Sequence, residues 1–128
     1  MVTAITQGIK VSVITEFQPF YSNPFQNHFV FSYKIRIENQ SENTIQLLRR
    51  HWHIVDSIGH NYEVEGEGVV GLQPVIESGE FHEYVSGCNL SSSVGKMYGT
   101  FLMERLIDGK ELSIEIPEFT MVTPYLLN

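Results

Sequence analysis

The sequence predicts an all-β fold, an antiparallel β-sandwich of seven to eight short strands. Three observations carry this prediction: apolar and polar residues alternate along several segments, turn residues separate these segments, and no segment forms a convincing helix. The 128 residues fit one domain, residues 1–128, and the 12% aromatic content is typical of β structure.

Two segments near the N-terminus show the clearest alternation. Residues 8–17 place Ile9, Val11 and Val13 on one face. In residues 28–39, one face holds five apolar side chains, Phe29, Phe31, Tyr33, Ile35 and Ile37. Because successive strand residues point to opposite faces, each segment predicts a strand with one buried and one solvated face.

Residues 44–57 predict a third strand, in which the alternation changes phase. Ile45 and Leu47 share one face, but the next apolar residues have the opposite parity: Leu48, Trp52 and Ile54. A slip of one residue indicates a β-bulge or a change of sheet near Leu47 and Leu48.

Four further strands are predicted later in the chain. A turn at residues 57–59 precedes predicted strands at residues 61–65, 79–85, 96–105 and 111–116. Asp108 and Gly109 form the turn signal of a hairpin. Pro117 is expected to end the last strand, because proline cannot donate a hydrogen bond to the ladder.

Two long connections are candidate binding segments, because loops on a rigid sandwich often carry function. Residues 18–27 contain Phe20, Tyr21 and Phe25, which are candidate apolar anchors for a partner. The alternative is that these aromatic rings pack onto the edge of the sandwich. The second connection, residues 66–78, begins with a glycine-rich motif.

Gly66, Gly68 and Gly71 spell G-x-G-x-x-G, the spacing of a dinucleotide phosphate loop. Such a loop must open a helix, whereas β-forming residues and Pro74 follow here. Three acids also share one face of the extended chain and oppose a phosphate unless a cation intervenes: Glu63, Glu65 and Glu67. The structural interpretation gives these glycines a positive φ, a bulge or a close strand crossing.

Two sets of residues are candidate metal ligands. His51 and His53 share one face of a strand, and a His-x-His pair suits Zn²⁺, Co²⁺ or Ni²⁺, with His60 and His82 joining only if the fold brings them near. The acids at positions 63, 65 and 67 could hold Mg²⁺ or Ca²⁺. The alternatives are outward-facing histidines around a core Trp52, and a solvated or guarded strand edge. No cofactor is certain, and a divalent cation, Mg²⁺ or Co²⁺, is left open.

Composition excludes several classes of function. The net charge is −7, and an acidic surface repels nucleic acid and anionic membranes. Cys88 is the single cysteine, so no internal disulfide forms. No signal peptide or membrane span is visible, which predicts a cytoplasmic protein. No nucleophile motif is present, so we expect a protein without catalytic activity.

Two motifs resemble the ApaG family. Residues 50–56, RHWHIVD, are similar to its RxWxIxD segment, and residues 63–74, EVEGEGVVGLQP, are similar to its EVxGxGVVGxQP motif. The resemblance covers about residues 3–127. It implies an immunoglobulin-like or fibronectin type III-like sandwich in a bacterial cytoplasmic protein that is labelled for cobalt and magnesium efflux. Similar eukaryotic domains resemble protein-interaction modules, and the family's glycine motif has been suggested as a pyrophosphate site.

The sequence therefore predicts a non-enzymatic module that binds an unidentified protein partner. Its predicted surface combines residues 66–74, including Gln73, with the aromatic residues of the first loop. One alternative is a protein that binds a nucleotide polyphosphate through a cation held by the three acids. The other is a divalent-cation sensor that uses those acids or the two histidines. Homo-oligomerisation is left open.

Overall fold

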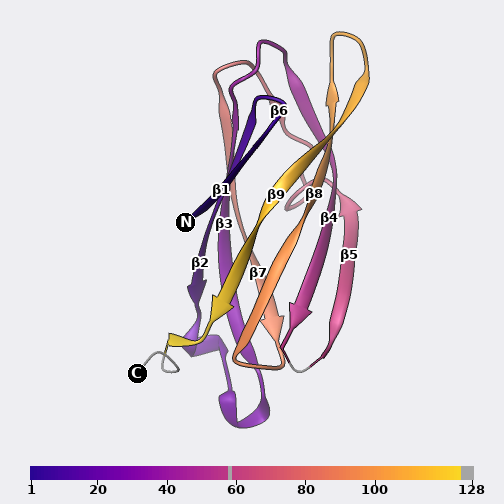
Figure 1. Ribbon diagram of the computed structural model, residues 1–128. Helices are drawn as coiled ribbons and strands as arrows, with labels where there is room; N and C mark the ends of the chain where they lie inside the picture. Colours follow the sequence, from indigo (N-terminus) through magenta and orange to yellow (C-terminus); the bar gives the residue numbers. More distant parts are fainter. Residues whose placement is uncertain (58, 125–128) are drawn as a thin grey trace.

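The computed structural model describes residues 1–57 and 59–124, which form a sandwich of two antiparallel sheets (Figure 1). The four-stranded sheet has the order β1 (Val2–Thr6), β2 (Ile9–Phe17), β3 (Phe29–Asn39) and β7 (Phe81–Leu90). The five-stranded sheet has the order β5 (Asn61–Glu67), β4 (Ile45–Asp56), β8 (Val94–Arg105) and β9 (Lys110–Val122), with β6 (Val75–Ile76) also paired to β4. The predicted antiparallel sandwich is confirmed, with nine strands among the described residues. The finer likeness to immunoglobulin or fibronectin type III domains stays a prediction.

The hydrophobic core lies between the two sheets and is centred on Trp52. The Trp52 ring meets Tyr33 of the opposite sheet edge-on at 5.5 Å between centroids, and it meets Phe119 and Phe101 at 5.8 Å and 6.5 Å. Aromatic pairs in this arrangement contribute about 1 kcal/mol each beyond the burial of their surface. The buried tryptophan therefore joins the two sheets and fixes the middle of β4.

The predicted bulge in β4 is confirmed. Leu47 pairs with Met103 of β8 and Arg49 pairs with Leu102, so Leu48 has no partner in the register. The carbonyl oxygen of Leu48 instead accepts a hydrogen bond from the amide of Gly68, at 2.8 Å. Because the extra residue reverses the alternation, the side chains after it are placed on the opposite faces from those expected without a bulge.

The N-terminal strand β1 was not predicted. It forms a hairpin with β2 through Gln7 and Gly8, whose φ values of 49° and 81° are those of a type I′ turn. The alternation in β1 is weak because its largest apolar side chain, Ile5, faces solvent. Residues 58 and 125–127, part of a predicted turn and of the predicted domain core, lie outside the described residues.

The prediction that Pro117 ends the last strand is wrong. Strand β9 continues to Val122, and the register with β8 shifts between Met97 and Gly99. Pro117 and Glu118 together oppose the single residue Tyr98, so the proline occupies a bulge, where no ladder hydrogen bond is required of it. The predicted hairpin turn at Asp108 and Gly109 is present, and Gly109 has a φ of 70°.

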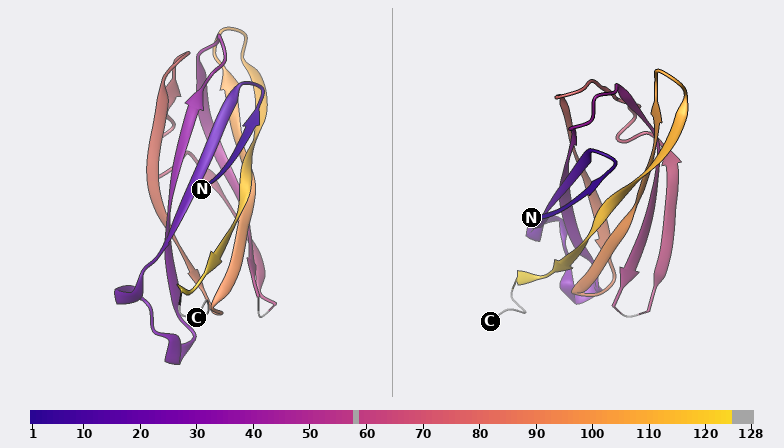
Figure 2. Two further views of the ribbon diagram at one scale, coloured as in Figure 1. Left: turned by 60° about the vertical axis from the view of Figure 1, so that its left-hand side comes forward. Right: turned by 45° about the horizontal axis from the view of Figure 1, so that its top comes forward.

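The segment between β2 and β3 projects from one end of the sandwich (Figure 2). It contains two short 3-10 turns, η1 (Pro19–Tyr21) and η2 (Pro24–Gln26). In the described parts of the chain, no helix has the length and apolar character needed to cross a membrane.

Candidate functional site

The outward face of β4 and β5 brings together the two sets of predicted metal ligands. In the register of this strand pair, His53 lies opposite Glu63 and His51 lies opposite Glu65. The bulge at Leu48 sets this phase, since it turns Trp52 into the core and both histidines outward. The sequence proposed the histidines and the acids separately, and the fold makes them one cluster.

Short distances connect the four side chains of this cluster. His51 Nε2 lies 2.9 Å from Glu63 Oε1, and His53 Nδ1 lies 3.3 Å from the same oxygen. The other ring nitrogen of His51, Nδ1, lies 3.2 Å from Glu65 Oε1. The two imidazole rings stack at 4.6 Å, and the Tyr98 ring stacks on His53 at 4.9 Å. Two imidazoles and a carboxylate therefore converge on one point at the surface.

The remaining predicted ligands do not join this cluster. Glu67 lies opposite Arg49 in the register, one step farther along β5. His82 belongs to β7 of the other sheet, and His60 lies before β5. Strand β5 is also an edge strand, so its row of acids occupies a position where charges discourage pairing between chains.

The glycine-rich turn uses its backbone amides within the protein. The Gly68 amide donates to Leu48, and the amides and carbonyls of Val69 and Leu72 pair with each other at 2.8 Å and 3.0 Å. Gly68 and Gly71 have positive φ values of 62° and 77°. The short strand β6, and no helix, follows the turn. Gly68 and Gly71 therefore have a backbone role, the positive φ that was the structural alternative to a phosphate loop.

Gly66 and Gln73 also have internal partners. Arg50 covers Gly66 and donates hydrogen bonds from Nη1 to the carbonyl oxygens of Glu67 and Gly68, both at 3.0 Å. Gln73 donates from Nε2 to the Leu48 carbonyl at 3.0 Å. These contacts fix the glycine-rich turn to β4.

A cleft of about 380 Å³ lies beside this turn, and sequence reasoning missed it. Its walls include Arg50, Tyr33, Tyr84 and Ser86. Burial raises the pKa of Tyr84, and its hydroxyl has no hydrogen-bond partner in the described part of the chain. The arginine was visible only as one letter of a motif, and nothing in the sequence placed it near these tyrosines.

The aromatic residues of the first loop face solvent. The exposed fractions are 97% for Phe20, 72% for Tyr21 and 100% for Phe25. The alternative in which they pack onto the sandwich edge is therefore not adopted. This loop lies at one end of the molecule, well away from the glycine-rich turn beside β5 (Figure 1). The two parts of the predicted binding surface are not contiguous.

Internal hydrogen bonds fix the conformation of this loop, residues 18–28, called the aromatic loop below. The Ser22 hydroxyl donates to the carbonyl of Gln18 and accepts from the amide of Val30, both at 2.8 Å. Asn23 and His28 form a bridge, with amide-to-carbonyl distances of 2.7 Å and 3.0 Å. The exposed rings therefore project from a loop whose backbone is held by internal hydrogen bonds.

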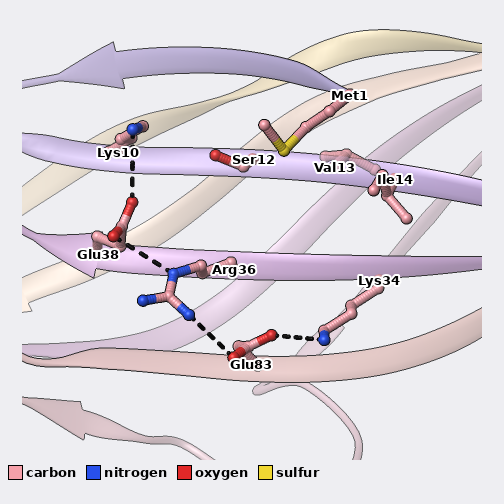
Figure 3. A pocket seen from close by; sticks show the side chains of 9 residues that line it. All are labelled: Met1, Lys10, Ser12, Val13, Ile14, Lys34, Arg36, Glu38 and Glu83. Atoms are coloured by element: carbon pink, nitrogen blue, oxygen red, sulfur yellow. Dashed lines mark hydrogen bonds and ion pairs between the residues drawn. The ribbon is translucent and has the colours of Figure 1, made fainter.

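The outer face of the four-stranded sheet carries a hollow of about 340 Å³ lined by ion pairs (Figure 3). Glu38 pairs with Lys10 at 3.7 Å and with Arg36 at 3.3 Å. Glu83 pairs with Arg36 at 3.0 Å and with Lys34 at 2.8 Å, and the hydrogen bond from Lys34 is the main cause of its lowered pKa. Because the charges compensate one another, this face is typical of a solvated sheet surface.

Cys88 is buried in β7. Burial raises the pKa of its thiol to about 11, so the thiol is protonated at neutral pH. A protonated, buried thiol behaves as a small apolar side chain and is a poor nucleophile.

Fold and surface together define a small all-β domain of the sandwich class. A family model described as the ApaG domain matches residues 19–105. The chain is 44% identical to "Protein ApaG" of Brucella abortus (strain S19), over 97% of this chain and 95% of that protein. The corresponding protein of Paramagnetospirillum magneticum is 46% identical, over 98% and 95%. The chain therefore belongs to the ApaG domain family.

A solved structure shares the fold. The crystal structure of the putative ApaA protein from Bordetella pertussis superposes with a TM-score of 0.87 at 39% identity, and the match covers 91% of this chain and 94% of that one. The agreement extends over both sheets of the sandwich, since so much of each chain is matched.

Proposed function

We propose that this ApaG domain is a non-enzymatic protein-binding module and that it contacts its partner through the aromatic loop, residues 18–28. The observation that carries the proposal is the near-complete exposure of Phe20 and Phe25. Large aromatic side chains are enriched at the energetic centres of protein interfaces. Burial of one phenylalanine side chain against a partner contributes about 2 kcal/mol.

The ordered backbone of the loop supports the same role. Pro19 and Pro24 begin the two 3-10 turns and restrict the chain, and Ser22 and Asn23 supply the hydrogen bonds that close it. A loop that is already ordered loses little conformational entropy on binding. The rings are therefore presented at low entropic cost.

The proposed surface is narrower than the one expected from the sequence. The glycine-rich turn is separate in space, and Gln73 is engaged with Leu48 (Figure 1). The nucleotide-polyphosphate alternative is not supported by the amides of Gly68 and Val69, which are already bonded within the turn. The link to cobalt resistance and magnesium efflux, the cellular compartment and homo-oligomerisation stay predictions.

Site-specific cross-linking in living cells tests the proposal. A photoreactive phenylalanine analogue replaces Phe25, and the matched control carries it in place of Ile107, which is 83% exposed in the turn after β8. We expect a discrete adduct from position 25 that is absent from position 107 and is lost when Phe20→Ser is added. Because both phenylalanines are exposed, Phe20→Ser and Phe25→Ser leave the melting temperature unchanged.

Two outcomes contradict the proposal. One is the absence of any adduct from position 25, and the other is the same set of adducts from both positions. An adduct of twice the chain's mass assigns the surface to a second copy of the chain.

A further inference from the structure

We infer that His51, His53 and Glu63 bind one divalent transition-metal ion, and that Glu65 positions His51 for this role. The inference is independent of the protein-binding proposal, because the cluster lies on the outward face of β4 and β5 and shares no residue with the aromatic loop. The ion class is that of Zn²⁺, Co²⁺ and Ni²⁺.

Strand geometry explains why three donors meet. His51 and His53 are two residues apart on β4 and therefore project from the same face. Glu63 lies directly opposite His53 on β5, where cross-strand side chains are in reach of each other. One ligand atom from each of the three residues lies within 4.8 Å of the others. Ligand atoms around a tetrahedral zinc ion are about 3.4 Å apart, so small side-chain rotations complete the site.

The carboxylates around His51 suit a cation at this point. His51 Nε2 forms a hydrogen bond with Glu63 Oε1 at 2.9 Å, and Nδ1 of the same ring lies 3.2 Å from Glu65 Oε1. When the Nε2 proton is released, its lone pair faces an oxygen that can only accept. A metal ion then takes the place of that proton between the two ligand atoms, while Nδ1 keeps its proton towards Glu65.

Glu65 and Tyr98 have positioning roles. Metal-bound histidines characteristically donate their second ring N–H to a carboxylate, and Glu65 Oε1, 3.2 Å from His51 Nδ1, is placed within reach of that role. The Tyr98 ring lies nearly parallel to His53, at an angle of 9°, and restricts the rotation of that imidazole. Both rings are therefore held before an ion binds.

The donor set decides which ions fit. Imidazole nitrogen suits zinc, cobalt and nickel, whereas Mg²⁺ and Ca²⁺ prefer sites made of oxygen. Three protein ligands leave a fourth position for water or another ligand. A row of acids that only guards a strand edge needs no histidines beneath it. Glu67 is such an acid, because it belongs to the same row and faces Arg49.

The contrast between Glu65 and Glu67 supplies a matched pair of variants. Each of Glu65→Gln and Glu67→Gln removes one carboxylate from the same face of β5, but of these two acids Glu65 lies 3.2 Å from His51 whereas Glu67 lies opposite Arg49. The full chain, free of any affinity tag, is titrated with ZnCl₂ and with CoCl₂. Calorimetry measures the affinity, and the visible absorption of bound Co²⁺ reports imidazole coordination.

We expect binding of one ion per chain with micromolar affinity or better, and no heat from MgCl₂ under the same conditions. His51→Ala and His53→Ala abolish the Co²⁺ spectrum while circular dichroism shows an intact fold. Glu65→Gln weakens binding by about 10- to 100-fold, the usual effect of losing a carboxylate that orients a ligand. Glu67→Gln leaves the affinity unchanged.

The inference is overturned if wild-type protein gives no saturable binding. It is also overturned if binding survives His51→Ala, which would place the ion elsewhere on the chain. Equal effects of Glu65→Gln and Glu67→Gln would reduce both acids to a general electrostatic contribution and remove the positioning role of Glu65.

Discussion

The guanidinium group of Arg50 lies directly over Gly66. A β carbon built on Gly66 would be 2.9 Å from both terminal nitrogens of Arg50. The missing side chain thus makes room for an arginine that bonds the carbonyl oxygens of Glu67 and Gly68. The end of β5 is held against β4 by this contact, and the three glycines of the motif consequently have unequal roles.

Alanine substitution should be more damaging at Gly68 than at the other two glycines of the motif. Gly68→Ala should lower the free energy of unfolding by about 3 kcal/mol, because the residue has a positive φ and its β carbon would be 2.2 Å from the Leu72 carbonyl oxygen. Gly66→Ala should cost about 1 kcal/mol, since only the flexible end of Arg50 must move. Gly71→Ala should also cost about 1 kcal/mol, for its φ alone. Urea unfolding of the three variants checks the order, and equal losses would contradict it.

Gly99→Ala should be among the most damaging single substitutions in the sheet. Its β carbon would lie 2.0 Å from the His51 carbonyl oxygen, and a backbone atom in a paired strand cannot move away cheaply. We expect a loss on the order of 3 kcal/mol in the free energy of unfolding. Gly87→Ala is the matched control, because the nearest atom to its β carbon is 3.5 Å away. A Gly99→Ala protein as stable as Gly87→Ala would show that β4 and β8 can separate at this position to admit a methyl group.

Asp56 should stabilise the turn between β7 and β8. Its buried carboxylate accepts a hydrogen bond from the Ser91 amide at 2.6 Å and another from the Ser92 hydroxyl. Asp56→Ala leaves the amide without its partner and should cost about 2 kcal/mol, whereas Ser92→Ala should cost about 1 kcal/mol. Thermal unfolding followed by circular dichroism measures both. An Asp56→Ala protein as stable as the wild type would mean that water replaces the carboxylate as the hydrogen-bond partner without loss of stability.

Cys88 should be unreactive in the folded protein. Since burial raises its pKa to about 11, little thiolate exists at neutral pH and the sulfur is shielded from reagents. We expect the reaction with Ellman's reagent to be on the order of 100-fold slower in the folded protein than in guanidinium chloride. Prompt modification without denaturant would contradict the buried position of β7 at this residue.

Asp108 should titrate at unusually low pH. The hydrogen bonds from Arg105, at 3.0 Å and 2.6 Å, are the main cause that lowers the pKa of Asp108 to about 2. A lowered pKa means that the carboxylate stabilises the folded state above its ordinary pKa of 3.8 and that this contribution is lost as the pH falls towards 2. Arg105→Ala should therefore raise the pKa of Asp108, as measured by carbon NMR of the carboxyl group.

The control for this titration is Lys110→Ala. Lys110 contributes its backbone amide to Asp108, at 3.2 Å, and an alanine keeps that amide. The substitution removes a nearby positive charge but should leave the pKa of Asp108 low. A similar rise in both variants would assign the shift to general charge and not to the arginine contact.

Alternation along the chain was sufficient to predict the sandwich, because one face of each strand is buried and the other solvated. The same signal located the bulge at Leu48, where the parity changes. The separate rule that proline ends a strand failed at Pro117, since the requirement for a ladder hydrogen bond does not apply inside a bulge. Alternation also missed β1, where Ile5 faces solvent and the apolar pattern is reversed.

The candidate sites were predictable in part. The sequence named His51 and Glu63, but their proximity depends on the register between β4 and β5, which the local pattern does not encode. The exposure of Phe25 depends on how the loop folds back, which composition cannot decide. The cleft beside Arg50 combines residues from both sheets, so no local motif could indicate it.

The unpaired Leu48 makes one position of strand β4 dispensable for its register. Without this residue, Leu47 would still lie opposite Met103 and Arg49 opposite Leu102, so regular pairing would keep Trp52 in the core and both histidines outward. The loss would fall on the glycine-rich turn, because the Leu48 carbonyl accepts hydrogen bonds from Gly68 and Gln73. For protein engineering, a deletion at Leu48 would therefore release this turn from the sheet without repacking the sandwich.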